Sequence, residues 1–140
     1  MEKEFIPYEQ ALALKELGFD EPCFGKYLSS LQSDWKDFEL TLEMGINEEF
    51  EDNRNIYLFE GACSAPTFSQ AFKFFREKHN LFYEIQIDRT TEPKFCFDIF
   101  QYEHFGNYEE IRIGEWYLYR TQEEAELECL KELIEIVKRK

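Results

Sequence analysis

Apolar residues recur with helical spacing in three stretches of the chain, and the first stretch follows Pro7. A proline suits a first helical turn because it lacks an N–H group, and Gly18 suits the left-handed position that ends many helices. The apolar positions between them include Tyr8, Ala11 and Leu12. This spacing predicts a helix near residues 8–17.

Two longer stretches each begin with a capping box, in which a hydroxyl residue and a Gln or Glu three residues later bond to the first N–H groups of a helix. Thr67 and Gln70 form the first box, and Thr121 and Glu124 form the second. The predicted helices cover residues 67–79 and 121–138. The buried side of the last helix is expected to consist of Leu127, Leu130, Leu133, Ile134 and Val137. We expect one shared core of Phe68, Phe72, Phe75, Leu130, Leu133 and Val137.

Alternation of apolar and polar residues with period two predicts strands between the helices. The clearest triplets are Phe38, Leu40 and Leu42, and Tyr83, Ile85 and Ile87. Further strands are predicted at Cys23–Leu28, Ile56–Glu60, Lys94–Tyr102 and Glu115–Tyr119, with loops at 43–55 and 103–114. Short links between consecutive strands favour antiparallel pairing. The sequence thus predicts an α+β fold in a single domain, 1–140, with one antiparallel sheet of five or six strands and three helices in the order α-β(2-3)-α-β(3)-α.

Composition narrows the classes of partner. Aromatic residues make up 18% of the chain, which favours a folded protein over a disordered acidic one. The formal net charge is −14, from 30 acidic and 16 basic residues. This charge repels nucleic-acid phosphates and anionic lipids, so we expect neither nucleic acid nor membrane as a partner. It is compatible with a solubilising surface, with a protein partner or with a mimic of DNA.

The four cysteines have neither disulfide-framework nor metal-site spacing. They lie 33 to 40 residues apart, with no CxxC pair and no His at zinc-finger spacing, at Cys23, Cys63, Cys96 and Cys129. The acidic stretch 34–60 lacks the spacing of an EF-hand. The first ten residues include four charged ones and lack the apolar stretch of a secretory signal, and no run of about 18 apolar residues occurs. We therefore expect a cytoplasmic protein with reduced, mostly buried thiols and without cofactor or metal.

Three blocks of the sequence resemble a family of small uncharacterised proteins from gut Bacteroides-type bacteria and their phages. The blocks are EFIPYEQALALKELGFDEPCF at residues 4–24, APTFSQAFKFFREKHNL at 65–81 and TQEEAELECLKELIEIVK at 121–138. The second block departs from the family at Lys73 and Phe74, where its members more often have Arg-Trp. The resemblance implies a phage-related or mobile-element setting and brings no known activity, cofactor or catalytic residue.

Two groups of residues are candidates for binding a partner protein. They are Lys73, Arg76 and Lys78 in the second predicted helix, and Trp116, Tyr117 and Tyr119 in the last predicted strand. The basic group suits an acidic partner or a second copy of the chain, and the alternative is a solvated face with local ion pairs. The aromatic group belongs to strands with rings on both faces, so the second face either forms an interface, including a homodimer, or is covered by helices.

Candidate catalytic chemistry is sparse. His104 follows Glu103 and could act as a base beside a thiol, and His79 is the one other histidine. The chain contains no nucleophile elbow, HExxH, P-loop or GxGxxG motif.

Three functions are compatible with the sequence. The first is a non-enzymatic accessory protein of a phage or mobile element that binds an unknown protein partner. The second is an acidic DNA mimic that inhibits a host nucleic-acid-binding protein, and the third is a small enzyme with an unrecognised site. The helix–three strands–helix order of 67–138 also matches a double-stranded-RNA-binding domain, but glutamates stand where such domains carry lysines.

Overall fold

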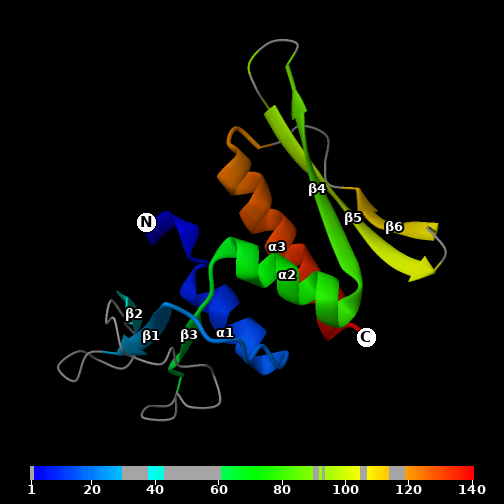
Figure 1. Ribbon diagram of the computed structural model, residues 1–140. Helices are drawn as coiled ribbons and strands as arrows, with labels where there is room; N and C mark the ends of the chain where they lie inside the picture. The colour runs from blue at the N-terminus through cyan, green and yellow to red at the C-terminus, as the bar shows by residue number, and fades with distance from the viewer. Residues whose placement is uncertain are drawn as a thin grey trace. The chain divides into compact units, whose positions relative to one another are not determined.

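The computed structural model describes residues 2–29, 38–42, 61–89, 92, 94–104, 107–113 and 119–140, and these form an α+β architecture (Figure 1). In chain order the elements are η1 (Glu2–Glu4), α1 (Tyr8–Glu16), β1 (Gly25–Ser29), β2 (Phe38–Leu42), β3 (Cys63–Ala65), α2 (Phe68–His79), β4 (Leu81–Asp88), β5 (Lys94–His104), β6 (Asn107–Ile113) and α3 (Gln122–Lys138). The three predicted helices are present, and every strand pair of the described residues is antiparallel. The predicted fold class is confirmed.

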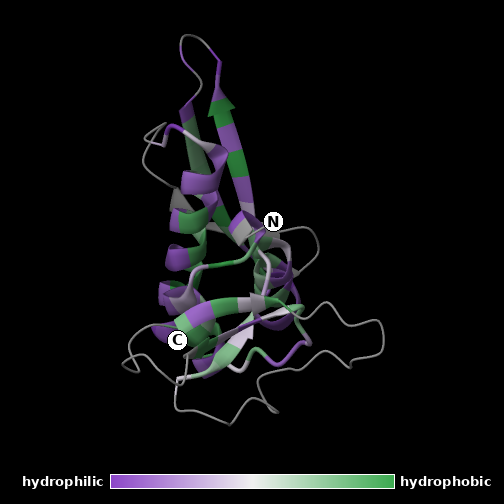
Figure 2. Cartoon of the chain, turned by 90° about the vertical axis from the view of Figure 1, so that its left-hand side faces the viewer, coloured by the Kyte–Doolittle hydropathy of each residue, from purple (hydrophilic) through white to green (hydrophobic). Residues whose placement is uncertain are grey.

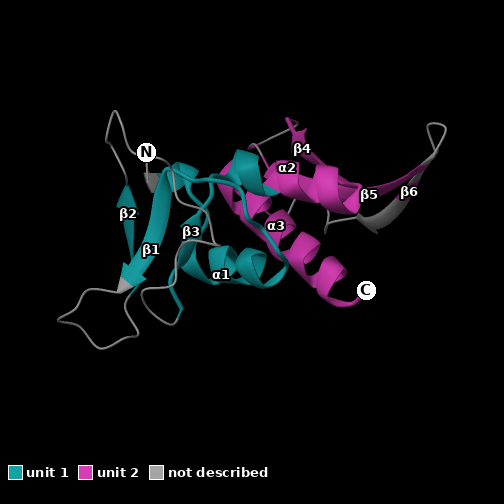
Figure 3. Ribbon diagram, turned by 60° about the horizontal axis from the view of Figure 1, so that its bottom comes forward, with its two compact units in different colours: residues 1–71 teal, residues 72–140 magenta. Residues whose placement is uncertain are grey.

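The chain divides into two compact units, Met1–Ala71 and Phe72–Lys140, and the boundary falls inside α2 (Figure 3). The first unit contains a sheet with the order β2-β1-β3, and the second contains a sheet with the order β4-β5-β6. The prediction of one sheet is therefore wrong for the described strands. Period-two alternation shows that a strand has a buried face, but it does not show which strands pair, because pairing depends on contacts distant in sequence. The single domain stays a prediction.

In the first unit, β1 is the central strand. Gly25 at its start pairs with Leu42 of β2 and with Ala65 of β3. A Cβ atom at Gly25 would lie 3.0 Å from the Leu40 side chain and 3.1 Å from that of Phe5, so glycine allows this close packing. β3 has three residues, too few for a period-two pattern, which explains why the sequence does not reveal it. The predicted strand at 56–60 lies outside the described residues.

α1 ends in a Schellman motif, as the position of Gly18 predicts. Gly18 has a φ of 95°, and its N–H donates to the carbonyl of Lys15 at 3.1 Å. The N–H of Phe19 donates to the carbonyl of Leu14 at 2.9 Å. The side chains of Phe19 and Leu14 are both buried, so this helix end is also a packing contact.

Both predicted capping boxes form their N-cap hydrogen bond. The N–H of Gln70 donates to Thr67 Oγ1 at 3.2 Å, and the N–H of Thr67 donates to Gln70 Oε1 at 3.1 Å. At α3, the N–H of Glu124 donates to Thr121 Oγ1 at 3.1 Å, and Glu124 Oε2 accepts from the N–H of Arg120 at 3.2 Å. These local bonds account for the accurate prediction of both helix starts.

The second sheet is built on the hairpin of β4 and β5, whose register runs without interruption from Leu81 opposite Gln101 to Asp88 opposite Lys94. Partners in an antiparallel pair share a face, so the odd-numbered residues of both strands lie on one face and the even-numbered residues on the other. β6 pairs with the other side of β5 and falls in the stretch 103–114. The prediction of a loop there is wrong, because the polar sequence of β6 is typical of an edge strand.

The odd-numbered face of this sheet packs against helices of the same unit. Tyr83 stacks on Phe72 of α2 with ring centroids 3.8 Å apart, and Phe97 and Ile99 are buried. α3 contacts both β4 and β5. Figure 2 shows polar and apolar positions separated along α3, in agreement with its exposed and buried residues.

The buried arc of α3 is rotated from the predicted one. Leu130, Leu133 and Ile134 are buried as expected, whereas Leu127 and Val137 are only half-buried. Ala125, Cys129 and Ile136 are buried instead. Helical spacing defines a stripe, but the sheet decides which part of a broad apolar arc it covers.

The predicted core residues of α2 are confirmed in part. Phe72 and Phe75 are buried, and Phe68, which belongs to the first unit, is half-buried. Phe74 is also buried, so α2 carries more buried rings than a single stripe.

Candidate functional site

Catalysis by the thiols is disfavoured by their surroundings. All four cysteines are free and buried. Burial raises the pKa of Cys63 to about 12, although the nearby Lys15 ammonium lowers it. Burial also raises the pKa of Cys129, and Glu126 and Glu132 add to this effect. Both thiols are therefore protonated at neutral pH, and a protonated thiol is a poor nucleophile.

The structure describes the side chain of His79 but not that of His104. His79 lies at the end of α2 beside Phe74, with ring centroids 5.2 Å apart, and its Nε2 is buried without a hydrogen-bond partner among the described residues. Burial lowers the pKa of His79, and Lys140 lowers it further. The side chain of His104 lies outside the described part of the structure, so its catalytic role stays a prediction.

Polar side chains of the first unit bond to backbone carbonyls. The Tyr8 hydroxyl donates to Gly61 O at 2.8 Å, and Lys15 Nζ donates to Ala62 O at 2.7 Å. The Tyr27 hydroxyl donates to Ile6 O at 2.6 Å. These groups satisfy the backbone around β3, which is a structural role.

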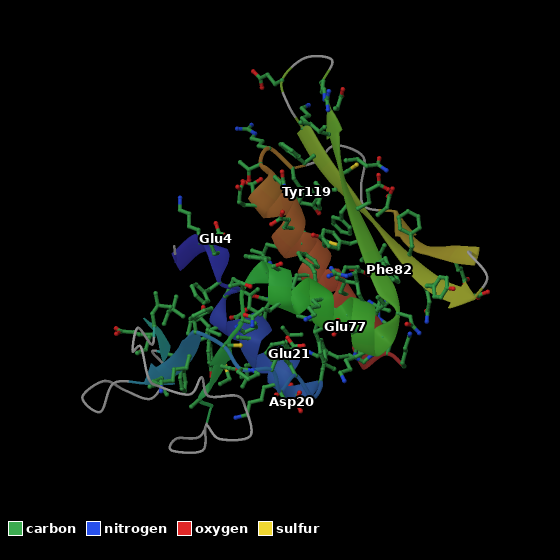
Figure 4. All side chains as sticks on the ribbon, in the orientation of Figure 1. Glu4, Asp20, Glu21, Glu77, Phe82 and Tyr119 are labelled. Carbon is green, nitrogen blue, oxygen red and sulfur yellow. The ribbon has the colours of Figure 1, made fainter. Side chains whose placement is uncertain are left out.

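The three basic candidates of α2 do not share one face. Lys73, Arg76 and Lys78 are all exposed. Because successive helix positions rotate by about 100°, Arg76 lies about 60° from Lys73, while Lys78 lies about 140° from it. Lys73 Nζ also lies 3.9 Å from Glu77 Oε1, and Figure 4 labels this glutamate on α2. The group is therefore divided, and one of its charges is paired locally.

Arg76 influences the pKa of Tyr83, which belongs to the same unit. Burial raises the pKa of Tyr83, Glu126 and Cys129 raise it further, and Arg76 lowers it. The charges of Arg76 on α2 and Glu126 on α3 therefore both influence Tyr83 on β4.

Of the three aromatic candidates, the structure describes Tyr119. Trp116 and Tyr117 lie outside the described residues, so their role stays a prediction. Tyr119 is half-buried at the start of α3 (Figure 4), where its backbone exchanges two hydrogen bonds with Phe95 at 2.8 and 3.1 Å. Its ring stacks on Phe97 with centroids 6.1 Å apart. These contacts give Tyr119 a role in packing the second unit.

The even-numbered face of the β4-β5-β6 sheet carries a different set of rings. Phe82 of β4 lies opposite Phe100 of β5, and Tyr102 follows Phe100 on the same face. The rings of Phe82 and Tyr102 meet edge to face with centroids 6.4 Å apart. All three side chains are half-buried. We call Phe82, Phe100 and Tyr102 the aromatic patch.

A buried polar group lies farther along the same face. Asp98 is 7% exposed and accepts a hydrogen bond from Gln86 Nε2 at 2.8 Å, while Cys96 Sγ lies 3.8 Å from Gln86 Oε1. Gln86 thus bonds to two residues of the neighbouring strand. These contacts stabilise the register of the hairpin next to the aromatic patch.

Within the described ranges, no group of three or more His, Cys, Asp or Glu side chains is placed to hold a metal ion. No helix in that part of the chain is long and apolar enough to cross a membrane.

No family model matches the chain, and no curated protein or solved structure matches it either. Among the described residues, the aromatic patch is the candidate site that the geometry offers. Sequence reasoning missed Phe82, because the pairing of β4 with β5 is needed to place it beside Phe100.

Proposed function

We propose that the protein is a non-enzymatic accessory protein that binds another protein through the aromatic patch. The resemblance of three sequence blocks supports a phage or mobile-element setting for this role. The alternative of self-association is less favourable, because two copies with a net charge of −14 repel each other.

One observation carries the proposal: three half-buried aromatic side chains lie together on the sheet face opposite the one that packs on α3. Aromatic residues combine large area with few rotatable bonds, so they anchor many protein interfaces. Their clustering on a sheet, which a buried polar group holds in register, gives a preorganised surface.

The two other functions have less support. The DNA-mimic alternative needs rows of unpaired carboxylates, yet two of the six acidic residues of α3 lie close to lysines. Lys131 Nζ lies 2.9 Å from Glu128 Oε1, and Lys138 Nζ lies 4.0 Å from Glu135 Oε1. A catalytic thiol would need a lower pKa than burial allows at Cys63 and Cys129.

Site-specific photo-crosslinking in the cells from which the gene comes tests the proposal. One variant replaces Phe82 by p-benzoylphenylalanine, which keeps an aromatic ring at that position. The control variant carries the same residue in place of Ser69, which is exposed on α2. We expect one discrete protein adduct from position 82 and none of the same mass from position 69.

The identity of the adduct decides between outcomes. A heterologous protein linked at position 82 supports the proposal. An adduct between two copies of this chain replaces it by self-association. Equal adducts at both positions, or none at position 82, overturn binding through the aromatic patch.

A further inference from the structure

β4 is an outer strand of the β4-β5-β6 sheet, so one of its edges has no partner strand among the described residues (Figure 1). The N–H of Tyr102 donates to the carbonyl of Asn80, and the β4–β5 register continues from this pair. Because bonded pairs alternate along an antiparallel ladder, the even-numbered residues of β4 bond to β5. Phe95 agrees with this phase, since it bonds to Tyr119 on the other side of β5. The N–H and C=O groups of the odd-numbered residues of β4 therefore point to its outer edge.

This outer edge lacks the features that commonly prevent the addition of a further strand. Edge strands are often protected by lysine, proline, a β-bulge or short length. β4 has the sequence LFYEIQID, with neither lysine nor proline, and its eight residues pair with β5 without a register shift. Exposure also rises along the strand, from the buried Leu81 to Ile87, whose side chain is 40% exposed. Residues 84–87 are therefore the accessible part of the edge.

The side chains along this edge favour a basic, alternating segment as its partner. Glu84 is exposed, and its partner across the ladder is Asp98 of β5. Like charges directly opposite each other are unfavourable, and a cation on the other side of Glu84 offsets them. On the opposite face, the half-buried Ile85 and the exposed Ile87 favour apolar neighbours. The net charge of −14 attracts a basic segment and repels a second copy of the chain.

We infer that a partner protein adds an antiparallel strand to the outer edge of β4, with a basic residue beside Glu84 and apolar residues beside Ile85 and Ile87. This inference rests on the proposed function and names how the partner pairs with the sheet. Main-chain hydrogen bonds supply the affinity in this binding mode, and alternate side chains supply the specificity. The apolar residues of the added strand point their own N–H groups at β4, and the N–H groups of its basic residues point away.

N-methylated peptides test these main-chain bonds directly. The probe is a fluorescent octapeptide of alternating lysine and valine, which has the length of β4. One analogue is N-methylated at its valines, whose N–H groups face β4, and the matched analogue is N-methylated at its lysines. Both analogues keep the side chains and the charge of the probe. In anisotropy titrations of the full chain at about 0.15 M salt, we expect valine methylation to weaken binding roughly five- to a hundredfold and lysine methylation to change it by less than about twofold.

Proline substitutions locate the bonds on the protein. Ile85→Pro removes an N–H group at the outer edge and none that bonds to β5, a position at which edge strands accept proline. Ile85→Ala is the matched control, because it shortens the side chain and keeps the N–H group. We expect Ile85→Pro to weaken binding of the unmodified peptide about two- to tenfold more than Ile85→Ala does. Ile87→Pro and Ile87→Ala repeat the comparison at an exposed position, should circular dichroism show that Ile85→Pro is unfolded.

Equal affinities for the two methylated peptides, or no binding of the unmodified peptide, overturn the inference. Equal losses for a folded proline variant and its alanine control overturn it as well. A wild-type dimer that Ile87→Pro dissociates in analytical ultracentrifugation shows that a second copy occupies the edge, which also overturns it. If position 82 crosslinks to a heterologous protein in any of these cases, binding through the aromatic patch survives and strand addition does not. The expected peptide selectivity without that crosslink supports strand addition and removes the aromatic patch as the binding site.

Discussion

Among the described glycines, Gly61 leaves the least room for a side chain. Alanine at Gly61 should therefore cost far more stability than alanine at Gly18. Both glycines have positive φ, 85° and 95°, which L-residues adopt at a cost of about 1–2 kcal/mol. At Gly18, nothing lies within 4 Å of the added Cβ. At Gly61, that atom would lie 2.8 Å from Cζ of Phe38 and 3.0 Å from the Tyr8 hydroxyl. Alanine at Gly61 must therefore displace a ring stack in addition to straining the backbone.

The magnitude follows from what the displacement breaks. Tyr8 stacks on Phe38 with centroids 4.5 Å apart, a contact that contributes about 0.5–1.5 kcal/mol beyond area burial. The Tyr8 hydroxyl also donates to Gly61 O at 2.8 Å, and such a bond contributes about 0.5–1.5 kcal/mol. We expect Gly18→Ala to lower the free energy of unfolding by about 1–2 kcal/mol and Gly61→Ala to lower it by about 2–5 kcal/mol.

Urea denaturation of the wild type and the two variants, followed by circular dichroism, measures these values. The difference between the variants isolates the steric effect, because both share the backbone strain. Equal losses would show that Phe38 and Tyr8 move aside without cost, and the account of this corner of the first unit would then be wrong.

Three further outcomes follow from the structure. Phe72→Ala should lower the free energy of unfolding by about 3–5 kcal/mol, since the ring is 2% exposed and stacked on Tyr83; urea denaturation would contradict this with a loss under about 1 kcal/mol. The lowered pKa of His79 means that the folded state binds its proton less readily than the unfolded state, so this contribution to stability is present above pH 6.5 and is lost as the pH falls below that value. Thermal melts from pH 8 to pH 5 should show the loss in the wild type but not in His79→Gln, and identical profiles would exclude His79 as the cause. A gel shift with duplex or single strands at about 0.15 M salt should show no binding, because the field of −14 charges opposes phosphate; micromolar binding that weakens with salt would refute this.

The sequence by itself determined the features that depend on neighbours a few residues away. The capping boxes at Thr67 and Thr121 and the left-handed Gly18 follow from bonds that span three to five residues. Residue count alone also places Lys78 and Lys73 on different sides of the helix, although the basic residues were grouped as one candidate site. The strands around Leu40 and Ile85 also follow from local alternation.

The tertiary structure alone decided which strands pair and which rings are covered. The chain pairs its strands as two sheets, turns 107–113 into an edge strand and rotates the buried arc of α3 towards Cys129. These outcomes depend on contacts between segments far apart in sequence, for which local patterns hold no information. The same holds for the aromatic patch, because Phe82 and Phe100 meet only when β4 pairs with β5 in the observed register.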